Sequence, residues 1–519
     1  MRFTARIGRG LAVAAGAALM LWPAILNRYP LMYPDSIGYL GDGRPLARIL
    51  FLHAPKGYPA MRSEFYSLGI FPFHWNLTPW PIVAWQALLT SWVLWLTLRS
   101  ILPHRTARRF VATFLILVAL LSLLTSVSWY VSLPMPDILG PLLYLAIYLL
   151  VFARETLSRG ERWSLSALAF WAITAHSTHL MLAVGICFLL ALLLLFRRPL
   201  VAGHARAAGQ IALLLVLAVT AQLALHRYLY GHATLNGNHA PYLMARIVAD
   251  GPGALYLRQH CATLDWAICS DVDHLPDNDD DFLWAPGVVW AGADARTQQR
   301  LLAEEMPLVR ATLRAYPLEQ AARSWANFTQ QLNDFGVNDF DNNDRMQQSL
   351  AHVFPSSAFP SSAIPSSATS YSRSLQARSI VPTNAFTILE RWVVLPSALL
   401  LAVLLPWLWR TAFTGPDNRR GLRVKLKGWL RRPVYTGHDD RESGYSRQRM
   451  RLLGLVVIVV PTLFANAFLT AVLSSSDSRY QARVIWLVPL LAALAALDLL
   501  AQRGPRRERQ QPENGTLLQ

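Results

Sequence analysis

Residues 452–471 read LLGLVVIVVPTLFANAFLTA, without one charged side chain, and residues 474–483 continue as SSSDSRYQAR. An α-helix needs about 20 mostly apolar residues to cross the hydrocarbon core of a bilayer. The first segment therefore predicts a membrane span, and the second predicts a polar loop at its mouth. This alternation decides the fold class, because it recurs along the whole chain.

Ten such segments predict an all-α polytopic membrane protein. They lie near Leu11–Leu26, Pro81–Leu98, Phe110–Ser128, Ile138–Ala153, Ser164–Ala175, Leu180–Phe196, Ala208–His226, Arg391–Trp409, Leu452–Ala471 and Val484–Ala501. Arginines precede the first segment as they would in a signal peptide, but no small-x-small cleavage site follows it, so an uncleaved span is favoured. The composition agrees, since only 15% of the residues are charged against about 25% in soluble domains.

The formal net charge of +17 over 519 residues would indicate nucleic-acid binding in a soluble protein. With both termini in the cytoplasm, however, the cytoplasmic segments hold 29 of the 48 basic residues and a net charge of +21. The opposite side carries −3, and Asp498 inside the last span supplies the remaining −1. Cytoplasmic loops of membrane proteins are enriched in Lys and Arg. The charge therefore records membrane insertion, and no nucleic-acid partner is expected. The basic loop 410–451 is interpreted as a topology determinant, with contact to anionic lipid headgroups as the alternative.

This topology divides the chain into three parts. Residues 1–226 form an N-terminal transmembrane module of about seven spans with a first outer loop at 27–80. Residues 227–390 form a large, mainly helical extracytoplasmic loop or lid, in which Glu304–Tyr316 and Pro317–Leu332 are amphipathic. A Pro-Ser-Ser-Ala repeat at 354–368 predicts a flexible segment there. Residues 391–519 form a C-terminal module of about three spans that includes loop 410–451.

Two cysteines, Cys261 and Cys269, lie close together in the large outer loop. An extracytoplasmic location permits oxidation, so a disulfide is favoured. The alternative is a pair of reduced thiols. No His or Cys partners complete a zinc site with them.

Two carboxylates stand at the predicted outer mouths of spans. Asp35 follows the first span in Tyr33-Pro-Asp-Ser-Ile-Gly-Tyr39, where Tyr39 shares its helix face, and Asp137 opens the fourth span in Pro134-Met-Pro-Asp137. Ionisable groups beside the membrane are costly and mark candidate functional sites. The alternative interpretation is helix capping, because Asp satisfies free N–H groups at a helix start.

Imidazole and guanidinium groups lie at the same predicted depth. His176 and His179 form the turn between the fifth and sixth spans, and Arg479, Tyr480 and Arg483 introduce the last span. The histidines are interpreted as substrate-orienting groups, with metal binding or a locally hydrogen-bonded turn as alternatives. The arginine fork suits a phosphate, and anchoring at the membrane interface is its alternative.

On these features the chain resembles the GT-C superfamily of integral-membrane glycosyltransferases, in particular uncharacterised bacterial members. The acidic residue after span one (Asp35, with Tyr39), the stretch Ala54-Pro-Lys-Gly-Tyr-Pro59 with Gln86, Asp137 at span four, and Arg479-Tyr480 before the last span carry the resemblance. Many members have a second carboxylate beside the first, where this chain has Ser36. Many also have a basic residue before the position of Pro55, where this chain has Ala54.

The resemblance implies a GT-C-like fold in a bacterial inner membrane and an inverting sugar transfer at the outer face. The donor would be a polyprenyl-phosphate-linked sugar, and the acceptor a glycan, a lipid or a protein. Asp35 would be the general base, Tyr39, Asp137, His176 and His179 would orient the substrates, and Arg479, Tyr480 and Arg483 would bind phosphate. No residue pattern requires a cofactor, although a divalent metal is left open.

Three other interpretations stay open. One is a lipid-linked glycan ligase or polymerase, which would not need Asp35. Another is a lipid or solute transporter, for which Asp498 inside the last span would be the proton site if it had no arginine partner. The third is a degenerate relative that acts as a scaffold.

Overall fold

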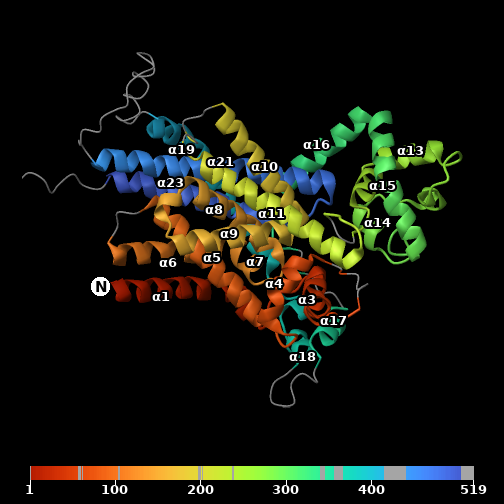
Figure 1. The fold of residues 1–519 in the computed structure, drawn as a ribbon, viewed down its shortest axis with the longest axis horizontal. Coiled ribbons are helices and arrows are strands. Elements are labelled where there is room, and N and C mark those ends of the chain that lie inside the picture. The colour runs from red at the N-terminus through yellow and green to blue at the C-terminus, as the bar shows by residue number, and fades with distance from the viewer. Residues whose placement is uncertain are drawn as a thin grey trace, which may run out of the picture.

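The computed structural model describes residues 2–55, 60, 62–102, 106–196, 200, 203–235, 239–338, 340, 345–355, 366–413 and 440–503. The regular structure in these ranges is entirely helical, which confirms the predicted all-α class. Long helices run side by side in one bundle, and a separate group of helices projects from the end opposite the N-terminus (Figure 1).

The described residues of the N-terminal half of the bundle form a series of α-helices and short 3-10 helices. They are α1 (Arg2–Met20), α2 (Trp22–Asn27), α3 (Pro34–Leu52), α4 (Glu64–His74), α5 (Trp80–Ile101), α6 (Ala107–Leu124), α7 (Val127–Val131), η1 (Pro136–Ile138), α8 (Leu139–Phe152), η2 (Arg154–Thr156), α9 (Arg159–Ala175), α10 (Ser177–Leu195) and α11 (Ala205–Tyr230).

The projecting group and the C-terminal helices complete the chain. The projecting group, called the outer domain, comprises α12 (Tyr242–Ala249), α13 (Pro252–His260), η4 (Ala267–His274), α14 (Asp279–Trp284), α15 (Ala295–Ala315) and α16 (Pro317–Asn333). The chain then returns to the bundle through α17 (Met346–Val353), α18 (Ser367–Ser372), η6 (Gln376–Arg378), α19 (Thr383–Phe413), α21 (Asp440–Leu473), α22 (Ser478–Ile485) and α23 (Leu487–Arg503).

Seven stretches of helix among the described residues are long and apolar enough to cross a membrane. They are Trp80–Ile101, Ala107–Leu124, Ser177–Leu195, Ala205–Tyr230, Thr383–Ala412, Arg447–Leu473 and Ser478–Leu500. The other three predicted spans coincide with shorter helices, namely the apolar part of α1 (Ile7–Met20), η1 with α8 (Pro136–Phe152), and α9 with its 17 residues. A multi-pass membrane protein follows from these helices, and the count of ten spans stays a prediction.

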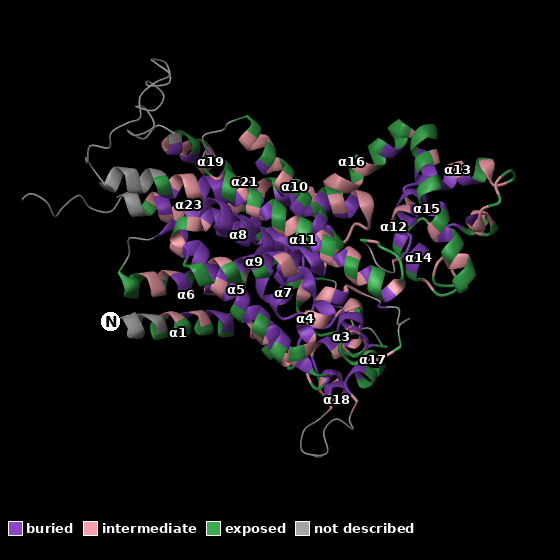
Figure 2. Cartoon of the chain, viewed as in Figure 1, coloured by how far each residue is buried: buried purple, intermediate pink, exposed green. Residues whose placement is uncertain are grey.

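Helix α8 is the centre of the bundle. All 14 of its residues are buried, and Figure 2 shows it surrounded by the other long helices. Its length is about 21 Å, shorter than the roughly 30 Å of hydrocarbon. Non-helical backbone is tolerated at membrane depth only where protein surrounds it. The irregular segment that precedes α8 meets this condition, because residues 132–138 are all buried.

Helix α21 packs closely against α8 at a glycine in the stretch quoted first. A Cβ atom at Gly454 would lie 2.5 Å from the ring of Phe152, so no side chain fits without displacing that ring. Small residues allow helices to approach in this way inside membranes.

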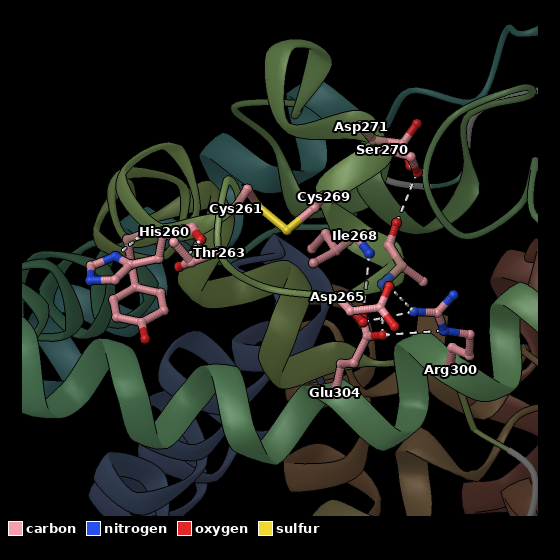
Figure 3. The surroundings of a disulfide bond; sticks show 12 residues. His260, Cys261, Thr263, Asp265, Ile268, Cys269, Ser270, Asp271, Arg300 and Glu304 are labelled. Carbon is pink, nitrogen blue, oxygen red and sulfur yellow. Dashed lines mark hydrogen bonds and ion pairs between the residues drawn. A yellow bond between two sulfur atoms is a disulfide. The ribbon is translucent and has the colours of Figure 1, made fainter.

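The outer domain has a hydrophobic core of its own, built from residues that include Met244, Phe282, Leu301 and Leu308. Cys261, after α13, and Cys269, in η4, are joined by a disulfide (Figure 3). Glu304 of α15 accepts a hydrogen bond from the N–H of Ala267 at 2.7 Å and so ties η4 to α15. A covalent link and a buried carboxylate therefore stabilise a segment that has little regular helix.

The predicted lid at 227–390 is divided in two by the structure. Its first part is the outer domain, but its second part, α17 and α18, packs against the bundle beside α3. Asn76 donates to the carbonyl of Val353 at 2.8 Å, and Tyr371 lies against Tyr29 with ring centroids 6.0 Å apart. Most of the Pro-Ser-Ser-Ala repeat, residues 356–365, lies outside the described residues.

We expect replacement of both Cys261 and Cys269 by serine to destabilise the outer domain by about 2–3 kcal/mol, the loop-closure value for a short loop. Hydrogen exchange would measure this. Relative to the wild-type chain, the double variant should exchange faster in α13 and η4, with no such increase in the long helices of the bundle. Cys187→Ser is the matched control, because this half-buried cysteine has no disulfide. Unchanged protection of α13 in the double variant would contradict the stabilising role of the disulfide.

Candidate functional site

Asp35 lies in the first turn of α3 and faces two guanidinium groups that come from distant parts of the chain. Its Oδ1 is bound by Nη2 of Arg62, and its Oδ2 lies 3.6 Å from Nη1 of Arg479. The N-cap of α3 is Tyr33, whose backbone N–H donates to Ser36. The carboxylate of Asp35 is thus directed to cations, contrary to the capping alternative.

Arg479 is buried although it lies within a polar stretch of the sequence. Its guanidinium lies over the ring of Tyr33, 4.0 Å from the centroid, and 5.1 Å from the ring centroid of Tyr480. Its Nε lies 3.8 Å from Asp477, the N-cap of α22. A cation held between aromatic faces and carboxylates is fixed in position, so the guanidinium of Arg479 is directed to protein groups.

Arg483, one turn further along α22, forms a second buried ion pair. Its Nη1 lies 3.4 Å from Oδ1 of Asp137, and its Nη2 donates to Oδ1 of Asn466 on α21 at 3.2 Å. The side chain of Arg483 is only 1% exposed and that of Asp137 3%. Asp137 therefore serves as a counter-ion, not as a helix cap, and Arg483 is less available to a ligand than Arg479.

The two histidines lie close to this pair but have different surroundings. His176 caps α10 and accepts a hydrogen bond from the N–H of Thr178 at 3.2 Å, as a locally bonded turn would. His179 is fully buried, its Nδ1 lies 3.0 Å from the carbonyl of Ala172, and its Nε2 has no hydrogen-bond partner among the described residues. A Cβ atom on Gly140 of α8 would lie 3.0 Å from that Nε2. His179 is thus at the α8 wall, where a ligand could reach it only if this contact loosened.

Tyr39 and Gln86 form the wall between Asp35 and the centre of the bundle. The buried ring of Tyr39 meets the ring of Tyr66 edge to face at 5.0 Å, and the Tyr66 hydroxyl donates to Gln86 at 2.8 Å. Gln86 in turn donates to the carbonyls of Val131 and Leu133. It thereby holds the irregular segment that leads to Asp137. Of the stretch that accompanies Gln86 in the resemblance, residues 56–59 lie outside the described residues.

Arg62 is the site residue that the sequence did not single out. The neighbouring Ser63 caps α4 and donates to the carbonyl of Thr174 at the end of α9. Glu64 accepts hydrogen bonds from Tyr230 at 2.6 Å and lies 3.2 Å from Nε2 of His226, both on α11. Burial opposes ionisation of Glu64, but these hydrogen bonds outweigh it and lower the pKa of its carboxyl. Arg62 therefore directly precedes Ser63 and Glu64, which hold the start of α4 against α9 and α11.

The outer domain reaches the site through α12 and α14. The guanidinium of Arg62 lies 5.9 Å from the ring centroid of Trp284, which is edge to face with Tyr242. Burial, together with Asp279 and Asp477, raises the pKa of the Asp280 carboxyl. Burial opposes the charged form of Arg62, but Asp35 and Tyr242 raise its pKa and keep it cationic. The site is therefore bounded on one side by the outer domain.

An apolar cavity of about 690 Å³ opens beside this wall. It is lined from α1, α4, α5 and α9 by Val13, Gly69, Phe73, Trp85, Leu88, Leu89, Trp92, Ser164, Ala167, Leu168 and Trp171. Trp171 stacks on Tyr66 at 5.8 Å between centroids, and Tyr66 contacts Tyr39. A continuous aromatic wall thus runs from the cavity to the helix that carries Asp35.

The described part of the chain contains no group of three or more His, Cys, Asp and Glu residues that could hold a metal ion. Asp498, the carboxylate inside the last span, pairs with Arg449 at 3.7 Å. No protein-family model, curated protein or solved structure matches this chain.

We expect Arg483→Met to destabilise the protein by about 3–5 kcal/mol, because it leaves the Asp137 carboxylate buried without its counter-ion. The double variant Asp137→Leu/Arg483→Met should recover much of this loss, since it removes both charges. Unfolding by SDS in mixed micelles measures the difference.

Asp265→Leu is the control, because Asp265 is fully exposed and its ion pair with Arg300 should contribute about 0–1 kcal/mol. A double variant at 137 and 483 that is as unstable as Arg483→Met alone would show that packing, not charge pairing, holds these residues.

Proposed function

We propose that the protein is a membrane glycosyltransferase that moves a sugar from a polyprenyl-phosphate donor to an acceptor at the outer face of a bacterial inner membrane. The observation that carries the proposal is the contact of one carboxylate, Asp35, with two guanidinium groups, those of Arg62 and Arg479. A carboxylate that can take a proton and guanidiniums that can receive a phosphate are what such a transfer needs.

The apolar cavity supports a donor that carries a lipid. Its lining is formed by aromatic and aliphatic side chains, with Ser164 as the hydroxyl-bearing member. A polyprenyl chain in this cavity would place its phosphate at the far end of the wall formed by Trp171, Tyr66 and Tyr39. That end of the wall lies at the helix of Asp35, where Arg62 and Arg479 meet.

The ion pairs suggest how donor binding would prepare the base. In the absence of substrate, Asp35 pairs with both guanidiniums. A phosphate binds guanidinium in the same forked geometry as a carboxylate, so the donor would take over Arg479 and Arg62 and release Asp35. The base would then become available when the donor is in place.

The transfer itself is a single displacement. An acceptor hydroxyl gives its proton to Asp35 while its oxygen bonds to the anomeric carbon. The bond from that carbon to the phosphate oxygen breaks, and the electron pair leaves with the polyprenyl phosphate. Arg479 and Arg62 stabilise the charge that grows on this phosphate, and the anomeric configuration inverts.

The remaining residues would position these groups. Asp137 and Arg483 hold α22 against η1, Tyr480 lies against both Arg479 and Arg483, and Gln86 fixes the segment before Asp137. Tyr39 would shield Asp35 from the interior of the bundle. His176 and His179 would face the sugar only after displacement of their present contacts, so we assign them a secondary role in orientation.

Two of the alternative functions, a ligase or polymerase and a transporter, would need different residues. A ligase or polymerase would not need Asp35 for its reaction. A transporter would use an unpaired carboxylate within a span, but Asp498 has an arginine partner. Neither alternative has a specific observation in its favour.

The test is the release of free polyprenyl phosphate from radiolabelled glucosyl-, galactosyl-, mannosyl- and arabinosyl-phosphopolyprenol in membranes that contain the full chain. This product appears whatever the acceptor is. We expect Asp35→Asn to lower its rate about 100-fold or more, the usual range for a lost general base. Arg479→Gln and Arg62→Gln should lose about as much through weaker phosphate stabilisation.

Asp265→Asn and Arg300→Gln are controls of the same chemical type on an exposed ion pair of the outer domain. Both should retain full activity. An unchanged rate in Asp35→Asn would remove this residue from the role of base, and no donor-dependent product from the wild-type chain would overturn the proposed function.

A further inference from the structure

Helix α16 of the outer domain directs three amide side chains toward the protein and two of its largest apolar side chains outward. Gln320 and Asn327 donate to Asp250 at 2.7 and 2.8 Å, and Gln331 donates to the carbonyl of Asp477 at 2.8 Å. The opposite face carries Leu318 and Trp325, which are 80% and 67% exposed. A helix on a water-facing surface has the reverse polarity, so the outward face of α16 is built for an apolar surrounding.

This outward face is continuous with a surface of the bundle. Trp325 contacts Phe328 with ring centroids 5.5 Å apart, and Phe328 contacts Phe468 of α21 at 6.0 Å. Phe464 and Phe468 are about half exposed on a stretch, Arg447–Leu473, that is long and apolar enough to span a membrane. In a bilayer those two side chains face lipid, so the aromatic row leads from the lipid-facing surface onto α16.

The position of α16 agrees with this continuity. It packs against α21 and α22 and extends from the end of the bundle toward the rest of the outer domain (Figure 1). Exposed residues occupy much of its outward side in Figure 2. Trp rings are favoured at the level of lipid headgroups because one edge is apolar and the other can donate a hydrogen bond.

We propose that the outward face of α16, centred on Trp325, lies in the headgroup region of the outer leaflet and anchors the outer domain to the membrane. The occupant of this face is lipid. This inference does not depend on the proposed sugar transfer.

The anchor would also act on the candidate site. Gln331 at the end of α16 both donates to the Asp477 carbonyl and accepts from the Asp477 N–H at 3.0 Å. Asp477 caps α22 and accepts from the N–H of Arg479 at 2.8 Å. A helix seated on lipid is therefore two contacts away from the guanidinium beside Asp35.

The test places a single reporter on α16 of the full chain in proteoliposomes. Trp325→Cys and, as a smaller change on the exposed side, Ala322→Cys are made in a Cys187→Ala background and labelled with a bimane fluorophore under non-reducing conditions. Gln299→Cys on the exposed part of α15 is the control. We expect lipid with a nitroxide near its headgroup to quench the 325 and 322 labels by about twofold or more and to leave the 299 label unchanged, as shallow interfacial burial requires.

Aqueous iodide should quench the labels in the opposite order. Iodide quenching at 322 and 325 as strong as at 299, without quenching by nitroxide lipid, would overturn the proposal in favour of a water-exposed face. Protection from both quenchers would also overturn it and indicate a protein occupant, which cross-linking between copies of the 325 variant would identify as a second chain. Either outcome leaves the transfer assay unaffected, so the two proposals fail independently.

Discussion

The contact of Asp35 with Arg62 and Arg479 is the constraint on which the rest of the site depends. It joins the first turn of α3, the segment before α4 and the start of α22, so it brings together parts of the chain more than 400 residues apart. Each guanidinium has further partners of its own, Trp284 for Arg62 and Tyr33 for Arg479. Charges removed from water are costly unless such partners compensate them. The three side chains therefore define one arrangement of the helices around them.

The second ion pair, Asp137 with Arg483, explains why the centre of the bundle is irregular. Helix α8 is too short to cross a bilayer by itself, and the segment before it is not a regular α-helix. Its free backbone groups are satisfied by protein: Gln86 donates to two of its carbonyls, and Leu31 donates its N–H to Ser132 at 3.0 Å. This irregular segment positions Asp137 toward α22, whereas a straight helix through the membrane would have placed a different residue there. The break in the helix and the second ion pair are thus one structural feature.

Much of this could be predicted because hydrophobic length is a local property. The apolar stretches predicted helices, and the polar residues at their mouths predicted that Asp35, Asp137, Arg479 and Arg483 lie at one depth. Which carboxylate pairs with which arginine was not predicted, because it depends on how the helices pack. Arg62 was missed because the first outer loop has no apolar periodicity, and a basic residue there gives no sign of its partner. The return of α17 and α18 to the bundle was missed for a related reason. It depends on contacts such as Asn76 with Val353, which join residues 277 positions apart. The count of spans could not be settled by hydropathy either, since α8 is as apolar as a span but shorter.

The outer domain contacts the site from two sides. Through Tyr242 and Trp284 it faces Arg62, and through Gln331 it holds Asp477 and hence the start of α22. Arg62 is thus in contact with the bundle and with the outer domain, whereas Arg479 is joined to the outer domain through Asp477. Any movement of that domain relative to the bundle must act on both guanidiniums together, while Asp35 stays on α3. A domain anchored at the membrane surface would restrict this movement to displacements along that surface. The distance between the carboxylate and its two cations is the quantity that such a displacement would change first.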